Sequence, residues 1–166
     1  MILEMSGVVT SLPPELKVIG VLGEGILSLL FVLAAWPDLR FRRIPNRLLL
    51  AAFVLRLLLW AAKMRVVPGG AYGSILQEVG GGLLLAALLL MVGKICKNGL
   101  GMGDVKFLFT AALFAGFWRT VSILFLGLLP AAAWSLVCLG TGRFSRTNRY
   151  PLGPFFLAGY ILERLI

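Results

Sequence analysis

Six long apolar blocks, joined by short connections that hold most of the charged residues, constrain the fold of this chain more than any other feature. The blocks lie at about 18–36, 48–62, 75–95, 105–118, 121–139 and 155–166. A helix needs about 20 apolar residues to cross the hydrocarbon core of a bilayer, and the second, fourth and sixth blocks are shorter than this. Because lipid offers no hydrogen bonds to the backbone, each block is expected to be a helix. The sequence therefore predicts an all-α, polytopic membrane helix bundle with about six transmembrane helices, and at least four.

The overall composition supports a membrane protein and argues against a nucleic-acid-binding one. Of the 166 residues, 60% are hydrophobic and only 14% are charged, whereas a soluble domain needs far more charge on its surface. A net charge of +9 would suit nucleic acid only if it formed a solvated basic face. Here most charges lie in short connections, where Lys and Arg orient a membrane protein. We therefore expect the lipid bilayer as a partner and no nucleic acid.

The residue types that are missing narrow the chemistry further. Histidine is absent, and the two cysteines, Cys96 and Cys138, are far apart in the sequence. This excludes histidine-dependent triads and provides neither a typical zinc site nor a disulfide framework, so we expect no metal and no other cofactor. The residues before Lys17 lack a basic segment, so we expect no cleavable signal peptide. Without repeats or a low-complexity linker, residues 1–166 are expected to form a single membrane-embedded domain.

The distribution of Lys and Arg among the connections predicts the orientation in the membrane. One side would hold ten basic residues: Arg40, Arg42, Arg43, Arg47, Lys94, Lys97, Lys106, Arg143, Arg146 and Arg149. The other side would hold five: Lys17, Lys63, Arg65, Arg119 and Arg164. Because the side richer in Lys and Arg faces the cytoplasm, we predict that the N-terminus is extracytoplasmic.

The only two aspartates of the chain, Asp38 and Asp104, are the candidate catalytic residues. They are 66 residues apart, but the predicted topology places both on the cytoplasmic side, at the end of the first helix and the start of the fourth. Two carboxyls at similar depth in a bundle can face each other and share a proton. The ionised carboxylate can then activate a water molecule while the protonated one polarises a carbonyl, which is the chemistry of aspartic peptide hydrolysis. The alternative is that both aspartates cap helices or pair with basic neighbours near the membrane interface.

Three segments resemble the type IV prepilin peptidases, a family of GxGD membrane aspartic proteases. Residues 38–46 (DLRFRRIPN) resemble their first aspartate motif, and residues 101–106 (GMGDVK) match their GxGD motif. Residues 150–159 (YPLGPFFLAG) resemble the Pro-rich start of their last helix. The resemblance implies an aspartic endopeptidase of the bacterial inner membrane that cuts the basic leader of prepilin or pseudopilin substrates at the cytoplasmic face.

The chain also departs from the longer members of that family. Those carry an N-terminal insertion with CxxC motifs, and many also methylate the new N-terminus, whereas here 37 residues precede Asp38 and none is cysteine. The chain resembles the short form of tight-adherence (Flp-type) pilus systems, so we expect cleavage without methyl transfer. Three alternatives stay open: a transporter or channel subunit, an inactive pilus-assembly scaffold, and a GxGD protease acting on other membrane peptides. The identity of the pilin and the oligomeric state are not predicted.

Several other residues have two interpretations. Lys106 would either act near the aspartates or extend to the lipid headgroups, and we favour the headgroups. Arg56, deep in the second block, requires a partner, which Glu24 or Glu78 could provide. The glycines of the run 80–82 are expected to permit close contact between helices.

Overall fold

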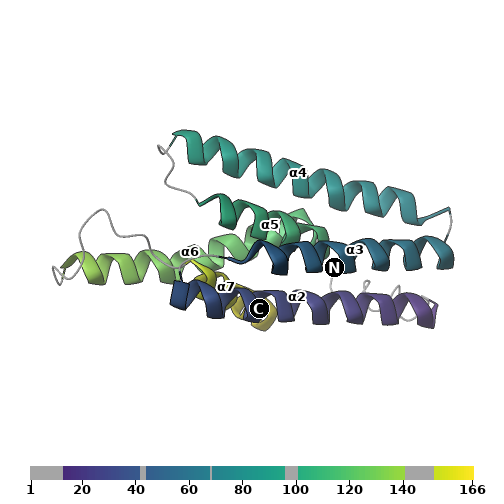
Figure 1. The fold of residues 1–166 in the computed structure, drawn as a ribbon, viewed down its shortest axis with the longest axis horizontal. Helices are drawn as coiled ribbons and strands as arrows, with labels where there is room; N and C mark the ends of the chain where they lie inside the picture. The colour runs from purple at the N-terminus through teal and green to yellow at the C-terminus, as the bar shows by residue number, and fades with distance from the viewer. Residues whose placement is uncertain (1–12, 42–43, 68, 96–100, 141–151) are drawn as a thin grey trace.

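Helices account for the regular structure in residues 13–41, 44–67, 69–95, 101–140 and 152–166, the part of the chain that the computed structural model describes. They are α2 (Pro14–Phe41), α3 (Asn46–Val66), α4 (Ala71–Ile95), α5 (Met102–Ala115), α6 (Phe117–Gly140) and α7 (Gly153–Leu165). In the bundle, α5 packs against α3 and α4, and α7 packs against α2 and α6 (Figure 1). The expected all-α, polytopic membrane bundle is confirmed.

Three of these helices are long and apolar enough to cross a membrane: α2, α4 and α6 over residues Phe117–Cys138. Helix α3 has 21 residues but holds four basic ones, Arg47, Arg56, Lys63 and Arg65. Helices α5 and α7 have only 14 and 13 residues. A span of about 20 residues is needed for a full crossing, so the number of crossings beyond these three stays a prediction.

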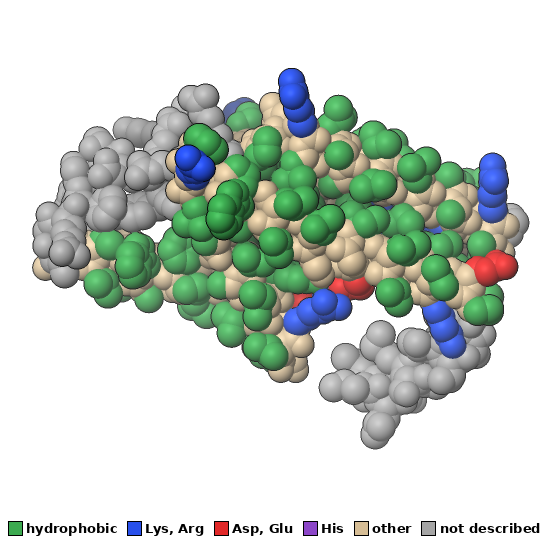
Figure 2. All heavy atoms as spheres, turned by 60° about the horizontal axis from the view of Figure 1, so that its bottom comes forward, with side chains coloured by type: hydrophobic (Ala, Val, Ile, Leu, Met, Phe, Trp, Pro, Cys, Tyr) green, Lys and Arg blue, Asp and Glu red, His purple; other side chains and the backbone are tan. Residues whose placement is uncertain are grey.

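The surface of the bundle is largely apolar, as expected for contact with lipid. Large hydrophobic side chains point outward from every long helix, and Trp118 and Leu76 are 80% and 73% exposed. Figure 2 shows hydrophobic side chains over most of one face, interrupted by few charged ones. Soluble monomers rarely expose apolar area on this scale, which marks the face as a membrane-contacting surface.

An aromatic cluster of Phe31, Phe107, Phe156 and Tyr160 joins α2, α5 and α7 at the centre of the core. The Phe31 ring meets Phe107 edge to face with centroids 5.0 Å apart and stacks on Tyr160 at 4.8 Å. Phe107 also stacks on Phe156 at 6.0 Å. All four side chains are buried. Because aromatic rings bury a large area in fixed geometries, the cluster fixes these three helices relative to one another.

The glycine run contributes close helix contacts at two of its three positions. A Cβ on Gly81 would lie 2.8 Å from Cβ of Phe117, and one on Gly82 would lie 3.3 Å from the side chains of Leu113 and Phe109. A Cβ on Gly80 would meet nothing within 4 Å. The expected close packing therefore holds for Gly81 and Gly82 but is wrong for Gly80.

The boundary between the fourth and fifth blocks differs from the prediction. Helix α5 ends at Ala115 and α6 already begins at Phe117, so the block predicted at 105–118 crosses a helix break. Gly116 between them has a φ of 81°, a conformation that residues with a Cβ rarely adopt. Its N–H donates to the Ala112 carbonyl at 2.9 Å. The residues on both sides of Gly116 are apolar, so the hydrophobicity of the sequence does not reveal the break between α5 and α6.

Candidate active site

Asp38 lies in the last turn of α2, with its side chain inside the bundle. The residue is only 5% exposed. Its Oδ2 accepts the N–H of Gly153 at 2.6 Å, and the Leu152 backbone also donates to the carboxyl. Both donors belong to the start of α7, where helix N–H groups lack partners within the helix and the dipole favours a negative charge. Asp38 is therefore held by backbone donors.

Asp104 lies in the first turn of α5, outside the three long apolar helices. Its carboxyl accepts a backbone hydrogen bond from Gly101, the residue at the N-cap of α5. This arrangement is half of a capping box, in which an acid at the third helical position reaches back to the N-cap N–H. A Cβ on Gly101 would lie 2.8 Å from Oδ2 of Asp104, so glycine at this position leaves room for the carboxyl.

The structure brings the two aspartates close enough to influence each other's ionisation. Burial, followed by the negative charge of Asp38, raises the pKa of Asp104 to about 6, and the Gly101 hydrogen bond opposes this rise. Two neighbouring carboxyls resist simultaneous ionisation and so favour a singly protonated pair. The alternative that both aspartates cap helices therefore describes their hydrogen bonds, since each carboxyl binds the N-terminus of a helix. It does not explain why the two carboxyls lie near each other.

The aromatic cluster of the core positions this pair. Phe31 precedes Asp38 by two helical turns, Phe107 follows Asp104 by one turn, and Phe156 follows Gly153 by one turn. Residues at these spacings lie on one face of a helix, so the helix faces that form the cluster also carry the carboxyls. The packing of the rings therefore fixes the positions of α2, α5 and α7 from which the polar groups extend.

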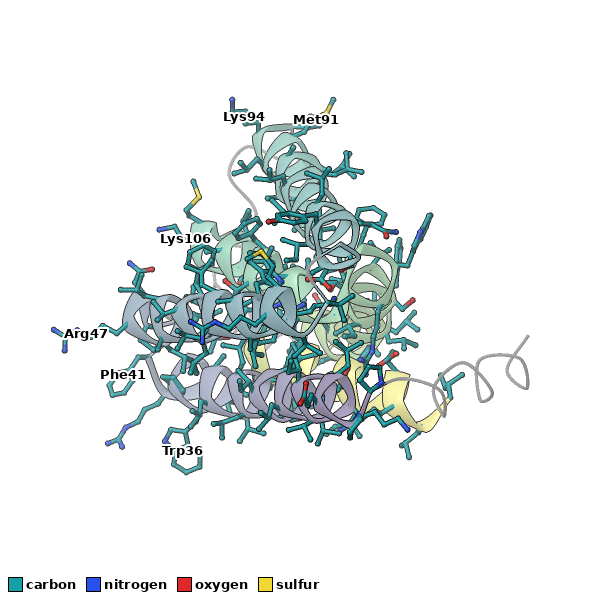
Figure 3. The ribbon with its side chains drawn as sticks, turned by 90° about the vertical axis from the view of Figure 1, so that its right-hand side faces the viewer. Trp36, Phe41, Arg47, Met91, Lys94 and Lys106 are labelled. Atoms are coloured by element: carbon teal, nitrogen blue, oxygen red, sulfur yellow. The ribbon has the colours of Figure 1, made fainter. Side chains whose placement is uncertain are left out.

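Two basic residues near the aspartates in the sequence, Lys106 and Arg47, do not point into the pair. Figure 3 shows Lys106 and Arg47 extending away from the bundle, and both are exposed. This supports the headgroup interpretation of Lys106 over a role beside the aspartates. Arg42 and Arg43 of the first motif, and Tyr150 and Pro151 of the third, lie outside the described residues.

Gly153 is a site residue that the sequence did not single out. Its N–H binds Asp38, and a Cβ on it would lie 3.0 Å from both Cβ and Oδ2 of Asp38. The available signal was the Pro-rich segment at 150–159, which resembles a family motif but does not reveal which of its residues reaches the aspartate.

The embedded charges form two networks away from the pair. Nη2 of Arg56 lies 2.6 Å from Oε2 of Glu78, which resolves the choice of its partner in favour of Glu78. Glu24 instead pairs with Arg119, whose Nε also donates to Glu163 at 3.0 Å. The second network links α2, α6 and α7 and was not predicted, because its members are far apart in sequence.

Fold and site together define a polytopic helical membrane protein with one buried and one half-buried carboxyl held at two helix N-termini. Residues 25–136, which include both aspartates, match the type IV leader peptidase family. The chain is 30% identical over 139 residues to the prepilin leader peptidase/N-methyltransferase of Bacillus subtilis (strain 168). The chain therefore belongs to the type IV leader peptidase family.

The alignment with the Bacillus subtilis relative covers 84% of this chain and 53% of that protein, so the chain spans about half of the relative's length. No solved structure matches the chain.

Proposed function

We propose that this protein is an aspartic endopeptidase of the membrane that removes the basic leader of prepilin-like proteins at the cytoplasmic face. The observation that carries the proposal is that Asp38, buried in the last turn of α2, and Asp104, half-buried in the first turn of α5, converge closely enough for the charge of Asp38 to raise the pKa of Asp104. Membership of the leader peptidase family supports this reaction, and the printed name of the Bacillus subtilis relative supports the substrate class.

The proposed reaction needs a singly protonated pair. The ionised carboxylate takes a proton from a water molecule, and the resulting hydroxide attacks the scissile carbonyl carbon. The protonated carboxyl donates to the carbonyl oxygen and stabilises the tetrahedral intermediate. When the intermediate collapses, the first carboxyl returns the proton to the leaving amine. A pKa of about 6 for Asp104 supports proton sharing close to neutral pH.

The proposed orientation places the pair next to the cytoplasmic headgroups. Lys94 lies in the last turn of α4, Arg47 in the first turn of α3 and Lys106 two residues after Asp104, and all three extend away from the bundle (Figure 3). Basic side chains gather on the cytoplasmic side of membrane proteins. A prepilin whose apolar helix lies in the bilayer would then present its leader junction at the depth of the pair. The proposal covers peptide cleavage only and assigns no methyl donor to this chain.

Processing of a tagged prepilin co-expressed in bacterial membranes tests the proposal. The parent should convert the prepilin to a shorter product whose mass corresponds to loss of the leader, and Asp38→Asn or Asp104→Asn should leave it at full length. Glu15→Gln removes an exposed acid at the far end of α2 and serves as the matched control, which should cleave like the parent. Cleavage by either aspartate variant at the parental rate would instead favour a transporter, channel or scaffold.

A further inference from the structure

A second polar site lies at the opposite end of the bundle from the aspartates. A cavity of about 250 Å³ opens between α2, α3, α4 and α5, and we call it the distal cavity. Gly23 lines it and precedes Asp38 by 15 residues, which at 1.5 Å per residue places the two roughly 22 Å apart along α2. The distal cavity is therefore separate from the candidate active site and close to the other membrane face.

The distal cavity carries an excess of positive charge. Four charged residues line it: Glu24, Arg56, Lys63 and Glu78. Arg119 and Arg164 already pair with Glu24 from outside the cavity. This leaves two cations, Arg56 and Lys63, against the single carboxylate of Glu78, and an anion with one negative charge would balance them.

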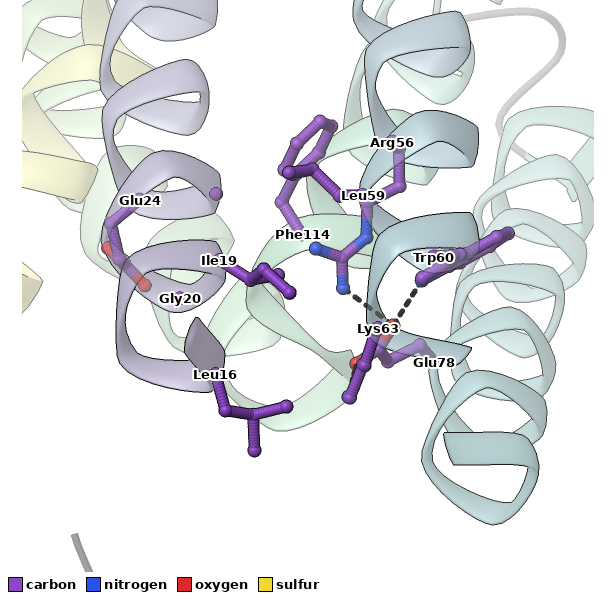
Figure 4. Close-up of a pocket in the computed structure, with 11 residues that line it drawn as sticks. Leu16, Ile19, Gly20, Glu24, Arg56, Leu59, Trp60, Lys63, Glu78 and Phe114 are labelled. Atoms are coloured by element: carbon purple, nitrogen blue, oxygen red, sulfur yellow. Dashed lines mark hydrogen bonds and ion pairs between the residues drawn. The ribbon is translucent and has the colours of Figure 1, made fainter. Parts of the chain in front are cut away.

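Glu78 is shared among several donors and does not saturate Arg56. Its Oε2 accepts from Arg56 Nη2 at 2.6 Å and from Trp60 Nε1 at 2.7 Å, while its Oε1 lies 3.6 Å from Lys63 Nζ (Figure 4). Arg56 is 8% exposed, and its Nε has no hydrogen-bond partner in the described part of the chain. A buried guanidinium with unused donors favours a further acceptor.

The guanidinium of Arg56 also reaches across the distal cavity. Its Nη1 lies 3.5 Å from the position that a Cβ on Gly23 would occupy, so the guanidinium points from α3 towards α2. Figure 4 shows it extending into the space between these helices. Phe114 and Trp60 flank the cation, with ring centroids 5.0 and 5.5 Å away, and hold it in this direction.

The remaining walls are apolar and suit a hydrocarbon chain. Leu16 and Ile19 line the distal cavity from α2, and Leu59 lines it from α3. Outside the cavity the same helices expose large hydrophobic side chains to lipid. A charged end facing an apolar wall matches the chemistry of a phosphate group that carries acyl chains.

We propose that the distal cavity binds a phosphate group, with Arg56 and Lys63 as its cationic ligands. A guanidinium binds phosphate oxygens through paired N–H donors, and an ammonium adds a second point of charge. The phosphate belongs either to a phospholipid, whose glycerol and acyl part would follow the apolar wall, or to a soluble phosphate. This proposal does not rest on peptidase activity.

Native mass spectrometry of the delipidated full chain in detergent tests the proposal with three probes. These are a short-chain phosphatidylglycerol, inorganic phosphate and a short-chain diacylglycerol. Gly20→Leu fills the distal cavity, because Gly20 lines it and a Cβ there meets nothing within 4 Å. Gly25→Leu is the matched control, since Gly25 lies on the same helix, is equally open and does not line the cavity. Lys63→Gln removes one cationic ligand without altering the bond between Arg56 and Glu78.

The parent and Gly25→Leu are expected to bind one phosphatidylglycerol. Gly20→Leu and Lys63→Gln should each weaken this binding about tenfold or more, as expected for loss of a charge-assisted contact. Binding of phosphatidylglycerol but not inorganic phosphate identifies a lipid, and equal binding of both identifies a soluble phosphate. Unchanged binding by Gly20→Leu, or diacylglycerol binding as tight as that of phosphatidylglycerol, overturns the proposal.

Discussion

Gly153 and Asp38 form a short hydrogen bond in the candidate active site. The hydrogen bond between them is 2.6 Å long. A methyl group at position 153 would crowd the side chain of Asp38, so glycine is required for this close approach. A backbone donor is fixed by the helix it begins, so it orients the carboxyl more rigidly than a long side chain would. The position of Asp38 therefore depends on α7 as well as on α2.

Gly153→Ala should displace the carboxyl of Asp38 and slow prepilin cleavage. The added Cβ would lie 3.0 Å from Cβ and Oδ2 of Asp38 and 3.3 Å from Cα of Ala35, so the aspartate or α7 must shift. Misplacement of a catalytic group by about 1 Å lowers rates on the order of 100-fold. Membrane assays of cleavage measure this loss, and Gly73→Ala, where a Cβ meets nothing within 4 Å, is the control. Parental activity in Gly153→Ala would contradict this role of Gly153.

The sequence identifies Asp38 and Asp104 because they are the only aspartates and lie in recognisable motifs. It does not identify Gly153, since a backbone N–H has no side-chain signature. Likewise, the sequence indicates that Arg56 needs an acidic partner within the membrane. That this partner is Glu78 and not Glu24 depends on how α3 packs against α4. The network of Glu24 with Arg119 and Glu163 joins three helices and follows from packing alone.

At the scale of elements, α6 and α7 approach each other through glycines. A Cβ on Gly159 would lie 2.4 Å from the Ile123 carbonyl oxygen and 2.6 Å from the Gly127 nitrogen. A Cβ on Gly127 would lie 2.7 Å from the Phe155 carbonyl oxygen. Small residues allow helices to pack closely in membranes, where dispersion forces between helices contribute much of the stability. This contact fixes α7, which carries Gly153 to Asp38.

Gly159→Ala should therefore destabilise the bundle. The added methyl group meets the backbone of α6, which cannot rotate away as a flexible side chain could, so the two helices must separate. Overpacking of this kind costs about 1–3 kcal/mol in the free energy of unfolding. Unfolding in mixed micelles with increasing dodecyl sulfate measures the change.

Gly80→Ala is the matched control for this experiment, because a Cβ there meets nothing within 4 Å. It should leave stability unchanged or slightly higher, since alanine favours the helix over glycine by roughly 0.5–1 kcal/mol. Equal stability of Gly159→Ala and the parent would show that α6 and α7 tolerate a wider separation.

The helix type was predictable at this scale, but the helix ends were not. Apolar blocks of sufficient length in a hydrophobic chain indicate membrane helices, and each of the six blocks overlaps a helix of the structure. Hydrophobicity does not record local backbone turns, so the break at Gly116 was missed and the start of α6 was placed too late. The extension of α2 to Phe41 was also missed, because charged residues at 38 and 40 resemble a connection.

At the scale of the whole molecule, the two ends of the bundle carry different chemistry. The aspartates lie at one end, and the distal cavity lies at the other, where Lys63 and Glu78 face each other. The positive-inside rule predicts that the aspartate end faces the cytoplasm. In the proposed function, this orientation would determine which part of a prepilin can reach the two aspartates.

Cysteine labelling tests the orientation in a chain carrying Cys96→Ser and Cys138→Ala. Gly69→Cys, in the connection between α3 and α4, should react with a membrane-impermeant maleimide in intact spheroplasts. Asn46→Cys, at the start of α3, should react only after lysis. Both positions are exposed, so a difference in labelling reports the side of the membrane. The reverse pattern would place the aspartates outside the cytoplasm.

In the proposed mechanism, Asp38 and Asp104 act as one unit, and the cleavage rate of the purified double variant Asp38→Asn/Asp104→Asn distinguishes this from independent action. Residues that act together lose most of their contribution when either is removed. We predict that Asp38→Asn and Asp104→Asn each slow prepilin cleavage about 1,000-fold or more, and that the double variant is no slower than either single one. Losses that multiply in the double variant, or a single variant that cleaves at the parental rate, would contradict a shared catalytic pair.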